Sequence, residues 1–317
     1  MGRYLVVRLY SMALTLAGLT VLVFLMLHLI PGTVVEQLIG ADAVASPEMV
    51  AQLKRFFGLD QPWHVQYGRW VGRLLHGDLG LSWRTGKPVG RLIWERLPVT
   101  LELTGLAVAF ALAAGITAGL VSALRPDRAA DQATRLSVLV GLSIPVFWQG
   151  TMLILFFSLY LRWMPPVVWV DFLADPRRNL TIMLLPTICL GTASAANIAR
   201  TTRSSMLDVL RSDYVRTALA KGLIDRVIVL KHALKNALIP IVTVAGLQVG
   251  YLLGGSVVVE EVFTLPGVGR LVLWSIYQRD YPVTQSTILF VAVLFMTVNL
   301  LVDLLYGYLE PRIRYGA

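Results

Sequence analysis

The chain has 317 residues, of which 56% are hydrophobic and 15% are charged, and its formal net charge at pH 7 is +9. Soluble domains are about 45–50% apolar and about 25% charged, so this composition excludes an ordinary water-soluble fold. A single cysteine, Cys189, excludes an internal disulfide and a thiolate metal cage, and we expect it to serve helix packing.

Six apolar blocks are long enough to cross a bilayer as helices. A helix needs about 20 apolar residues to cross a hydrocarbon core of about 30 Å, where no water is present to satisfy the backbone. The predicted spans are residues 10–30, 98–124, 136–161, 180–199, 237–259 and 281–302. The first ends at Pro31 and is longer than the apolar core of a cleaved signal peptide, so we interpret it as a retained anchor. The sequence therefore predicts an all-α integral membrane protein with about six transmembrane helices.

The predicted outer loop at residues 31–97 holds one clear helix signal. Ser46 can cap a helix that begins at Pro47 and stops at Gly58. The run at 76–80 is rich in turn residues and is predicted to be irregular. A loop of this length is uncommon unless it has a task, and we interpret it as a cover over the outer mouth of a pathway.

The predicted cytoplasmic segment at residues 200–235 begins as a continuation of the fourth span. Ser212 then offers a cap for a short helix from Asp213 to Lys221, and Gly222 follows its end. Such a short helix is unstable alone in water, so it has to dock on something. Apolar residues among its charges favour a protein partner over the alternative, in which the basic groups simply lie on anionic lipid headgroups.

Basic residues collect on one predicted face of the membrane. They are Arg3 and Arg8, Arg125, Arg128 and Arg135, eight residues between Arg200 and Lys235, and Arg312 and Arg314. The positive-inside rule therefore places both termini in the cytoplasm. The same bias explains the net charge of +9 without a nucleic-acid ligand.

Small residues recur at every fourth position in two of the spans. Gly115 and Gly119 lie in the second, and Gly246, Gly250 and Gly254 lie in the fifth. Spacing of this kind lets helix backbones approach closely, so these glycines predict tight helix packing.

A few polar side chains interrupt the apolar spans. Asn197, Gln248 and Asn299 either line a polar path or bond between helices. Glu102 and Asp303 lie close enough to the membrane surfaces to be solvated, which favours a structural role over a functional one. The residues of a substrate path stay unidentified.

Motifs for chemistry are missing from the sequence. It has no G-x-x-x-x-G-K-[ST] loop, no H-E-x-x-H and no G-x-S-x-G turn. We therefore predict no catalytic, cofactor-binding or metal-ligating residues. A self-sufficient channel or ion-coupled carrier and a membrane enzyme are the competing hypotheses; the uncharged spans speak against the first and the missing catalytic constellation against the second.

Several runs carry a resemblance along the whole chain. They are T-R-S-S-M-L-D-V-L-R-S-D-Y-V-R-T-A-L-A-K-G at 202–222, H-A-L-K-N-A-L-I-P at 232–240, H-L-I-P-G at 28–32, G-L-D-Q-P at 58–62, H-G-D-L-G-L-S at 76–82, L-P-G-V-G-R at 265–270, R-D-Y-P-V at 279–283 and N-L-L-V-D-L-L-Y-G at 299–307. In these motifs the chain resembles ABC-importer permeases of the dipeptide/oligopeptide/nickel family, in its dipeptide-permease B branch. Two positions depart from the pattern: Leu219 stands where arginine is common, and Thr33 replaces a frequent aspartate.

The resemblance implies a type I ABC importer permease fold and a passive subunit that forms half of a pathway for di- or oligopeptides, with nickel or glutathione as alternative cargo. It implies a second, C-type permease, two ABC ATPase subunits or one ATPase pair, and an external binding protein, all at a bacterial cytoplasmic (inner) membrane. The implied ATPase-coupling residues are Asp213, Tyr214, Val215, Arg216, Thr217, Ala218, Lys221 and Gly222. Bulk at Ala218 or Gly222 is expected to hold the docking surfaces apart.

Overall fold

The computed structural model describes residues 2–39, 46–166 and 168–309. Arg312 and Arg314, which the sequence places on the inner side, lie outside the described residues. The chain separates into two compact units, described one at a time below. Unit 1 comprises Met1–Pro98 and Pro266–Met296, and unit 2 comprises Val99–Leu265 and Thr297–Ala317.

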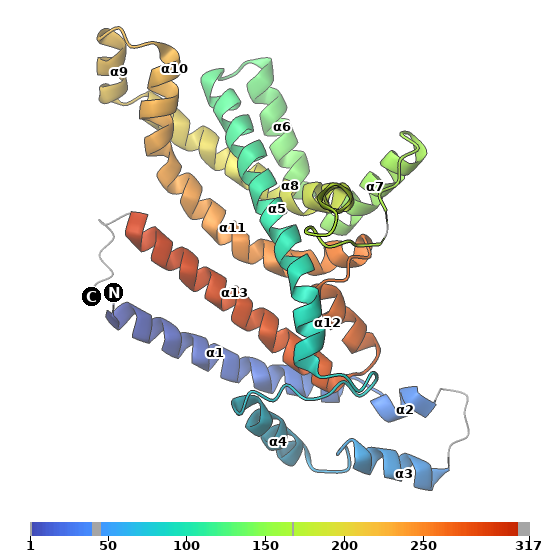
Figure 1. The fold of residues 1–317 in the computed structure, drawn as a ribbon. Helices are drawn as coiled ribbons and strands as arrows, with labels where there is room; N and C mark the ends of the chain where they lie inside the picture. Colours follow the sequence, from blue (N-terminus) through green and yellow to red (C-terminus); the bar gives the residue numbers. More distant parts are fainter. Residues whose placement is uncertain (1, 40–45, 167, 310–317) are drawn as a thin grey trace. The chain divides into compact units, whose positions relative to one another are not determined.

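Helices make up most of the described structure, and within those residues the only β-pairing is an isolated bridge between Leu81 and Pro88. The elements are α1 (Gly2–Leu29), α2 (Val34–Ile39), α3 (Pro47–Phe56), α4 (Trp63–Leu75), α5 (Val89–Leu124), α6 (Ala129–Ser143), α7 (Val146–Leu159), α8 (Pro176–Leu210), α9 (Asp213–Ala220), α10 (Asp225–Val227), the π-helix η1 (Ile228–Ala233), α11 (Leu234–Val262), α12 (Val268–Tyr277) and α13 (Tyr281–Leu309), as Figure 1 shows. Helices α5 and α13 each contribute residues to both units.

Five of the predicted spans are single helices that are long and apolar enough to cross a membrane. They are Tyr4–Leu29, Val89–Leu124, Pro176–Leu210, Asp225–Val262 and Tyr281–Leu304. The helical membrane fold predicted from composition is therefore confirmed.

The predicted span at 136–161 differs from a straight helix. It is divided between α6 and α7, and the chain bends by 110° between them. Ile144 has an extended backbone, with φ −82° and ψ 124°, and Pro145 follows it. The proline ring clashes with a helical conformation of the preceding residue, so the helix stops there. Both sides of the break are apolar, and hydropathy alone does not reveal it.

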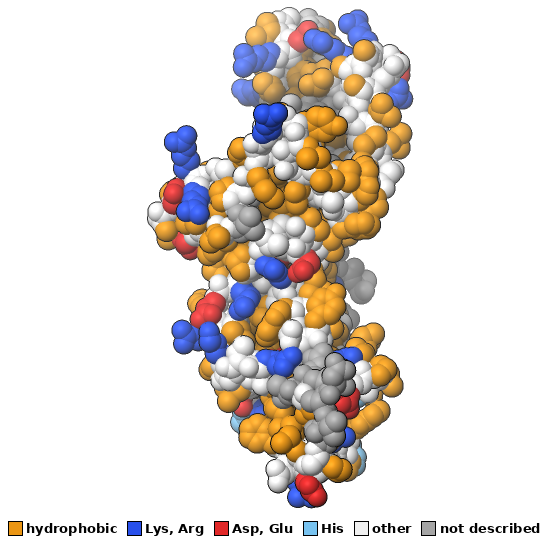
Figure 2. All heavy atoms as spheres, turned by 90° about the vertical axis from the view of Figure 1, so that its right-hand side faces the viewer, with side chains coloured by type: hydrophobic (Ala, Val, Ile, Leu, Met, Phe, Trp, Pro, Cys, Tyr) orange, Lys and Arg blue, Asp and Glu red, His pale blue; other side chains and the backbone are white. Residues whose placement is uncertain are grey.

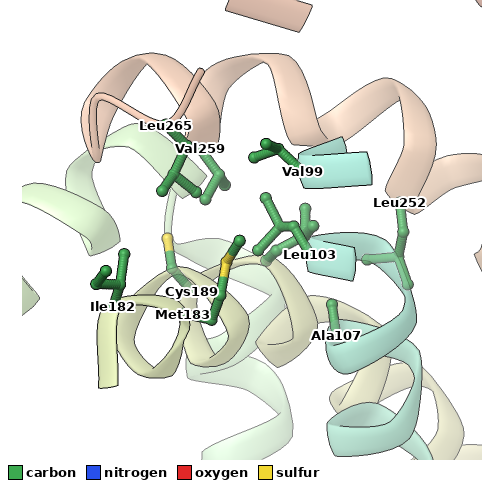
Figure 3. Close-up of a cluster of buried hydrophobic side chains, with 10 residues drawn as sticks. Val99, Leu103, Ala107, Ile182, Met183, Cys189, Leu252, Val259 and Leu265 are labelled. Atoms are coloured by element: carbon green, nitrogen blue, oxygen red, sulfur yellow. The ribbon is translucent and has the colours of Figure 1, made fainter. Parts of the chain in front are cut away.

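Helix α8 lies at the centre of unit 2 and packs against α6, α7 and α11. Its buried side chains join others from α5 and α11 in one hydrophobic cluster, shown in Figure 3. Cys189 belongs to this cluster and is 1% exposed, which confirms its predicted packing role.

The glycines of α5 bring it close to α8. A Cβ added at Gly115 would lie 2.7 Å from the carbonyl oxygen of Ala195, and one at Gly119 would lie 2.5 Å from that of Ala199. No real Cβ tolerates such contacts, so the predicted close packing of this helix is confirmed. In α11 the pattern is mixed: Gly246 lies tightly against Val302, whereas a Cβ at Gly254 would meet nothing within 4 Å among the described atoms.

In unit 1, two of the sequence motifs meet although about two hundred residues separate them. Asp280, from R-D-Y-P-V, is fully buried, and its carboxylate accepts hydrogen bonds from the Ser82 hydroxyl and from the backbone N–H of Trp83 at 3.1 Å. The hydroxyl of Ser286 donates to the carbonyl of Leu79 at 2.9 Å. These bonds fix the irregular 76–82 segment on the start of α13.

The predicted helix of the outer loop is also present. The hydroxyl of Ser46 accepts a hydrogen bond from the N–H of Met49 at 3.2 Å, and α3 runs from Pro47 to Phe56. Gly58 follows with φ +68°, as expected for a helix-terminating glycine.

Candidate coupling surface

The short helix predicted after the fourth span is α9, Asp213–Ala220, with Lys221 as its final cap residue. Asp213 stands in its first turn, where a negative charge suits the helix dipole. Ser212 occupies the predicted cap position, but its hydroxyl donates to the carbonyl of Val209 instead of accepting from the helix. Its backbone carbonyl accepts from the N–H groups of Val215 and Arg216 instead.

The far end of α9 is closed by a Schellman motif. Gly222 has φ +76°, its N–H donates to the carbonyl of Leu219 at 2.9 Å, and the N–H of Leu223 donates to the carbonyl of Ala218 at 3.3 Å. This pattern satisfies two helix-terminal carbonyls and needs a left-handed residue, which glycine adopts without strain. The chain therefore turns sharply after the helix.

One face of α9 is anchored to the rest of unit 2. Val215 is 2% exposed, and α9 packs against η1. The amide nitrogen of Asn236, in α11, donates a hydrogen bond to the hydroxyl of Tyr214 at 2.7 Å. These contacts explain why so short a helix persists.

The other face of α9 is open. Asp213, Arg216, Thr217 and Lys221 are exposed, and Ala218 is half-buried. Arg216 lies 3.7 Å from Asp213 with both side chains largely in solvent, so that ion pair adds little stability.

Apolar side chains adjoin these charges. Leu219, Leu223 and Ile224 are 50%, 40% and 67% exposed. Figure 2 shows Lys and Arg side chains gathered at the end of unit 2 where α9 and the α5–α6 turn lie, with hydrophobic side chains between and below them. A basic rim around exposed apolar groups is typical of a surface that binds another protein.

The support beneath α9 has an unusual backbone. In η1 the hydrogen bonds span five residues, and the N–H of Leu234 still donates to the carbonyl of Val229. Single turns of π-helix inside longer helices occur frequently at functional sites. Here the π-turn lies where α9 contacts the continuous helix from Asp225 to Val262.

A buried ion pair holds the stretch of α8 that leads into α9. Asp131, in the first turn of α6, is fully buried, and the guanidinium of Arg203 donates to both of its carboxylate oxygens at 2.7 and 2.8 Å. The Ser122 hydroxyl donates to the same carboxylate at 2.5 Å, and the N–H of Asp127 donates at 3.0 Å. These contacts tie α5 and α6 to the part of α8 that leads into α9.

The polar residues of the spans have mainly structural partners. The side-chain oxygen of Gln248 accepts from the Ser194 hydroxyl at 3.0 Å, which links α11 to α8. Asn197 accepts from Arg200 on its own helix at 3.1 Å. A bond between helices is thus confirmed for Gln248, whereas no path-lining role is established for these residues.

Replacing Gly222 separates its two possible roles. Gly222→Val forces a β-branched residue into φ +76° and costs about 1–2 kcal/mol at the helix end. Gly222→Asn adds comparable bulk, but asparagine tolerates this backbone. A Cβ at Gly222 would meet nothing within 4 Å among the described atoms. We expect vesicle transport to fall about tenfold in the valine variant, in line with 1–2 kcal/mol, and the asparagine variant to keep more transport if the left-handed turn, rather than bulk against the docked partner, is the main role of Gly222. Equal loss in both would show that bulk at a partner contact is what matters.

Comparison with known proteins agrees with this geometry. The family model for the binding-protein-dependent transport system inner membrane component matches residues 115–315. This segment contains α9 together with η1 and α11, which α9 contacts. The chain belongs to this family. A second model, for the N-terminal part of such membrane components, matches residues 1–104. The chain is therefore a permease component and, like its relatives, not an enzyme itself.

Curated relatives match this permease over almost its full length. The dipeptide transport system permease protein DppB of Alkalihalophilus pseudofirmus is 44% identical, with 98% of this chain and 99% of the relative covered. The di/tripeptide transport system permease protein DppB of Pseudomonas aeruginosa is 43% identical, with 95% of each covered. The glutathione transport system permease protein GsiC of Salmonella paratyphi A is 42% identical, with 99% of this chain and 100% of the relative covered.

Solved structures share the fold. A chain of the MetNI methionine ABC transporter in an inward-facing conformation has a TM-score of 0.55 at 19% identity, and the match covers 68% of this chain and 95% of that one. A chain of an amino acid ABC transporter with histidines has a TM-score of 0.51 at 17% identity, covering 71% and 95%. The type I importer permease fold expected from the sequence is thus confirmed.

One feature of the site and one helix of unit 1 escaped the sequence analysis. In the sequence, Asp131 is one of several charged residues in a predicted cytoplasmic turn, and nothing distinguishes it from the others. Its spacing of nine residues from Ser122 nevertheless allows the two side chains to meet where two helices are joined by a short turn. Helix α4 was missed as well, although Trp63, Tyr67, Trp70 and Leu74 recur at helical spacing.

Proposed function

We propose that this permease forms half of the translocation pathway of an ATP-driven importer of di- or oligopeptides. A second, C-type permease completes the pathway, and two ABC ATPase subunits, or one ATPase pair, bind the α9 surfaces. An external binding protein delivers substrate to the outer segments of unit 1. Closure of the ATPases switches the pathway between outward and inward access.

The observation that carries this proposal is the division of α9 into an anchored and an open face. Val215 and Tyr214 hold the helix on η1 and α11, while Arg216, Thr217 and Leu219 are left to solvent. The end of a rigidly held helix can transmit a push from a partner into the spans. The eight residues named as coupling residues occupy this helix and its terminating turn.

The peptide assignment rests on the relatives. Two of them, at 44% and 43% identity, are named as dipeptide and di/tripeptide permeases. A glutathione permease at 42% identity supports glutathione as a second candidate, and glutathione is itself a tripeptide. Nickel import and an ATP-independent channel or carrier are the remaining alternatives.

We place the protein in the bacterial cytoplasmic membrane, with both termini in the cytoplasm. The basic residues around α9 and the α5–α6 turn support this orientation, because the positive-inside rule places such residues in the cytoplasm.

Affinity purification from the native membrane in mild detergent tests the assembly. We expect ATP-binding chains and a second permease to travel with the tagged chain, and the purified complex in vesicles to import radiolabelled dipeptide only with ATP and the external binding protein. Import of glutathione or nickel but not dipeptide would replace the substrate. Transport by this chain alone without ATP would overturn the proposal.

A further inference from the structure

Unit 1 contains a cavity of about 470 Å³ beside the end of the first span. Its walls come from the last part of α1, the end of α3 and the residues after it, one face of α4, the 78–83 segment and the start of α13. Phe24 and His28 indicate how deep in the membrane the cavity lies, because they line it and belong to the final turns of the first span. The cavity therefore lies at the level where hydrocarbon gives way to headgroups.

One wall of the cavity is aromatic. The Phe24 ring stacks on His28 with centroids 4.1 Å apart and lies 6.4 Å from Trp70. Trp83 lies 4.9 Å from Phe57 and 5.3 Å from Tyr281. Rings of this kind gather at the membrane interface, where they contact both acyl chains and headgroups.

The cavity is also lined by positively charged side chains. They are the exposed residues Arg55, Arg69 and Arg73. Arg69 and Arg73 lie one turn apart on α4, on the face that also presents Gln66 and Trp70 to the cavity. Guanidinium groups bind phosphate through paired N–H donors.

These arginines are not neutralised by the part of the chain described here. Among the described residues no carboxylate lies within ion-pair distance of them. Asp78, an acidic residue that lines the cavity, accepts a hydrogen bond from the backbone N–H of Gly80 at 2.8 Å. The cavity thus combines an apolar wall with an excess of positive charge.

The helices that carry the arginines also expose apolar groups. Helix α3 has no buried residue, and α4 has only Trp70. Phe56 and Leu75 are 82% and 81% exposed. Amphipathic helices with basic residues on one side and bare aromatic or aliphatic groups on the other lie in the membrane interface. A lipid therefore reaches this cavity from the surface on which α3 and α4 rest.

We propose that this cavity binds the headgroup of an anionic phospholipid, with its phosphate on Arg55, Arg69 and Arg73 and its glycerol and upper acyl carbons along the aromatic wall. The bound lipid covers the cavity and fastens α3 and α4 to α1. This assignment depends only on the membrane location of the first span and is independent of the transported substrate.

Native mass spectrometry of the full chain, released from nanodiscs of phosphatidylcholine and phosphatidylglycerol, tests the site. We expect phosphatidylglycerol to be retained by the unchanged chain and by R91Q, a control in which an exposed arginine of unit 1, paired with Glu95, is removed. The R55Q/R69Q/R73Q variant should retain at least tenfold less phosphatidylglycerol, because it removes the three guanidinium groups that bind the lipid phosphate. The R69Q/R73Q pair serves the same purpose if the triple variant does not insert.

Equal retention of phosphatidylglycerol by the arginine variants and the unchanged chain would overturn the proposal. So would displacement of the lipid by millimolar inorganic phosphate, which would indicate a free-anion site, or by a dipeptide, which would indicate a substrate site.

Discussion

Val215→Asp should lower ATP-driven transport by tenfold or more while leaving insertion of the chain in the membrane unchanged. Val215 is the buried anchor of α9, at 2% exposure. Aspartate in its place removes the apolar contact of Val215 and buries a carboxylate away from water. The loss of hydration costs about 1–3 kcal/mol or more. An isolated helix of this length has no stability of its own to oppose that cost. The helix is therefore expected to leave η1, and a push from the ATPases then no longer reaches the spans.

Ala220→Asp is the matched control, because it introduces the same charge on the same helix, at an exposed position that is not among the eight coupling residues. Transport is measured in vesicles together with ATP hydrolysis and with the amount of ATPase that co-purifies. The anchor variant should lose transport much more than the control does. If both variants transport alike, docking of α9 on η1 is not what transmits the ATPase movement.

The sequence was informative about α9 because its signals are local. Asp213 at the start and Gly222 past the end mark the helix within a few residues, and both act through the backbone next to them. The five unbroken spans are equally local, since length and hydropathy decide them. The position of Ser212 was also predictable, but the direction of its hydroxyl was not, because Val209 competes for it.

The sequence was less informative wherever two distant segments determine the structure. Nothing in the sequence near Asp280 predicts that the Ser82 hydroxyl will donate a hydrogen bond to its carboxylate. The bend at Pro145 was missed for another reason: a proline inside an apolar run is tolerated in many membrane helices, as Pro186 is within α8 here. Whether a proline bends a helix depends on neighbours that restore the lost backbone bonds.

The Asp131–Arg203 pair gives rise to the second large prediction, on stability. Asp131→Ala leaves the Arg203 guanidinium, the Ser122 hydroxyl and the N–H of Asp127 without their common acceptor. Unsatisfied buried donors cost about 1–3 kcal/mol each, and Arg203 recovers part of this because its side chain is 25% exposed. We expect the free energy of unfolding in mixed micelles to fall by about 2–3 kcal/mol.

Asp208→Ala removes an exposed carboxylate from the same helix as Arg203 and should change the free energy of unfolding little. The double variant Asp131→Leu with Arg203→Leu should recover much of the loss, since replacing both partners of a buried pair by apolar groups leaves no unpaired charge.

The Asp131–Arg203 pair should also affect transport. Because Arg203 holds the part of α8 that leads into α9, Asp131→Ala should lower transport per ATP hydrolysed, whereas the double variant restores stability but not the fixed angle between α6 and α8. Full transport by Asp131→Ala, with unchanged unfolding, would show that α8 is positioned by its packing on α5 and α11 alone.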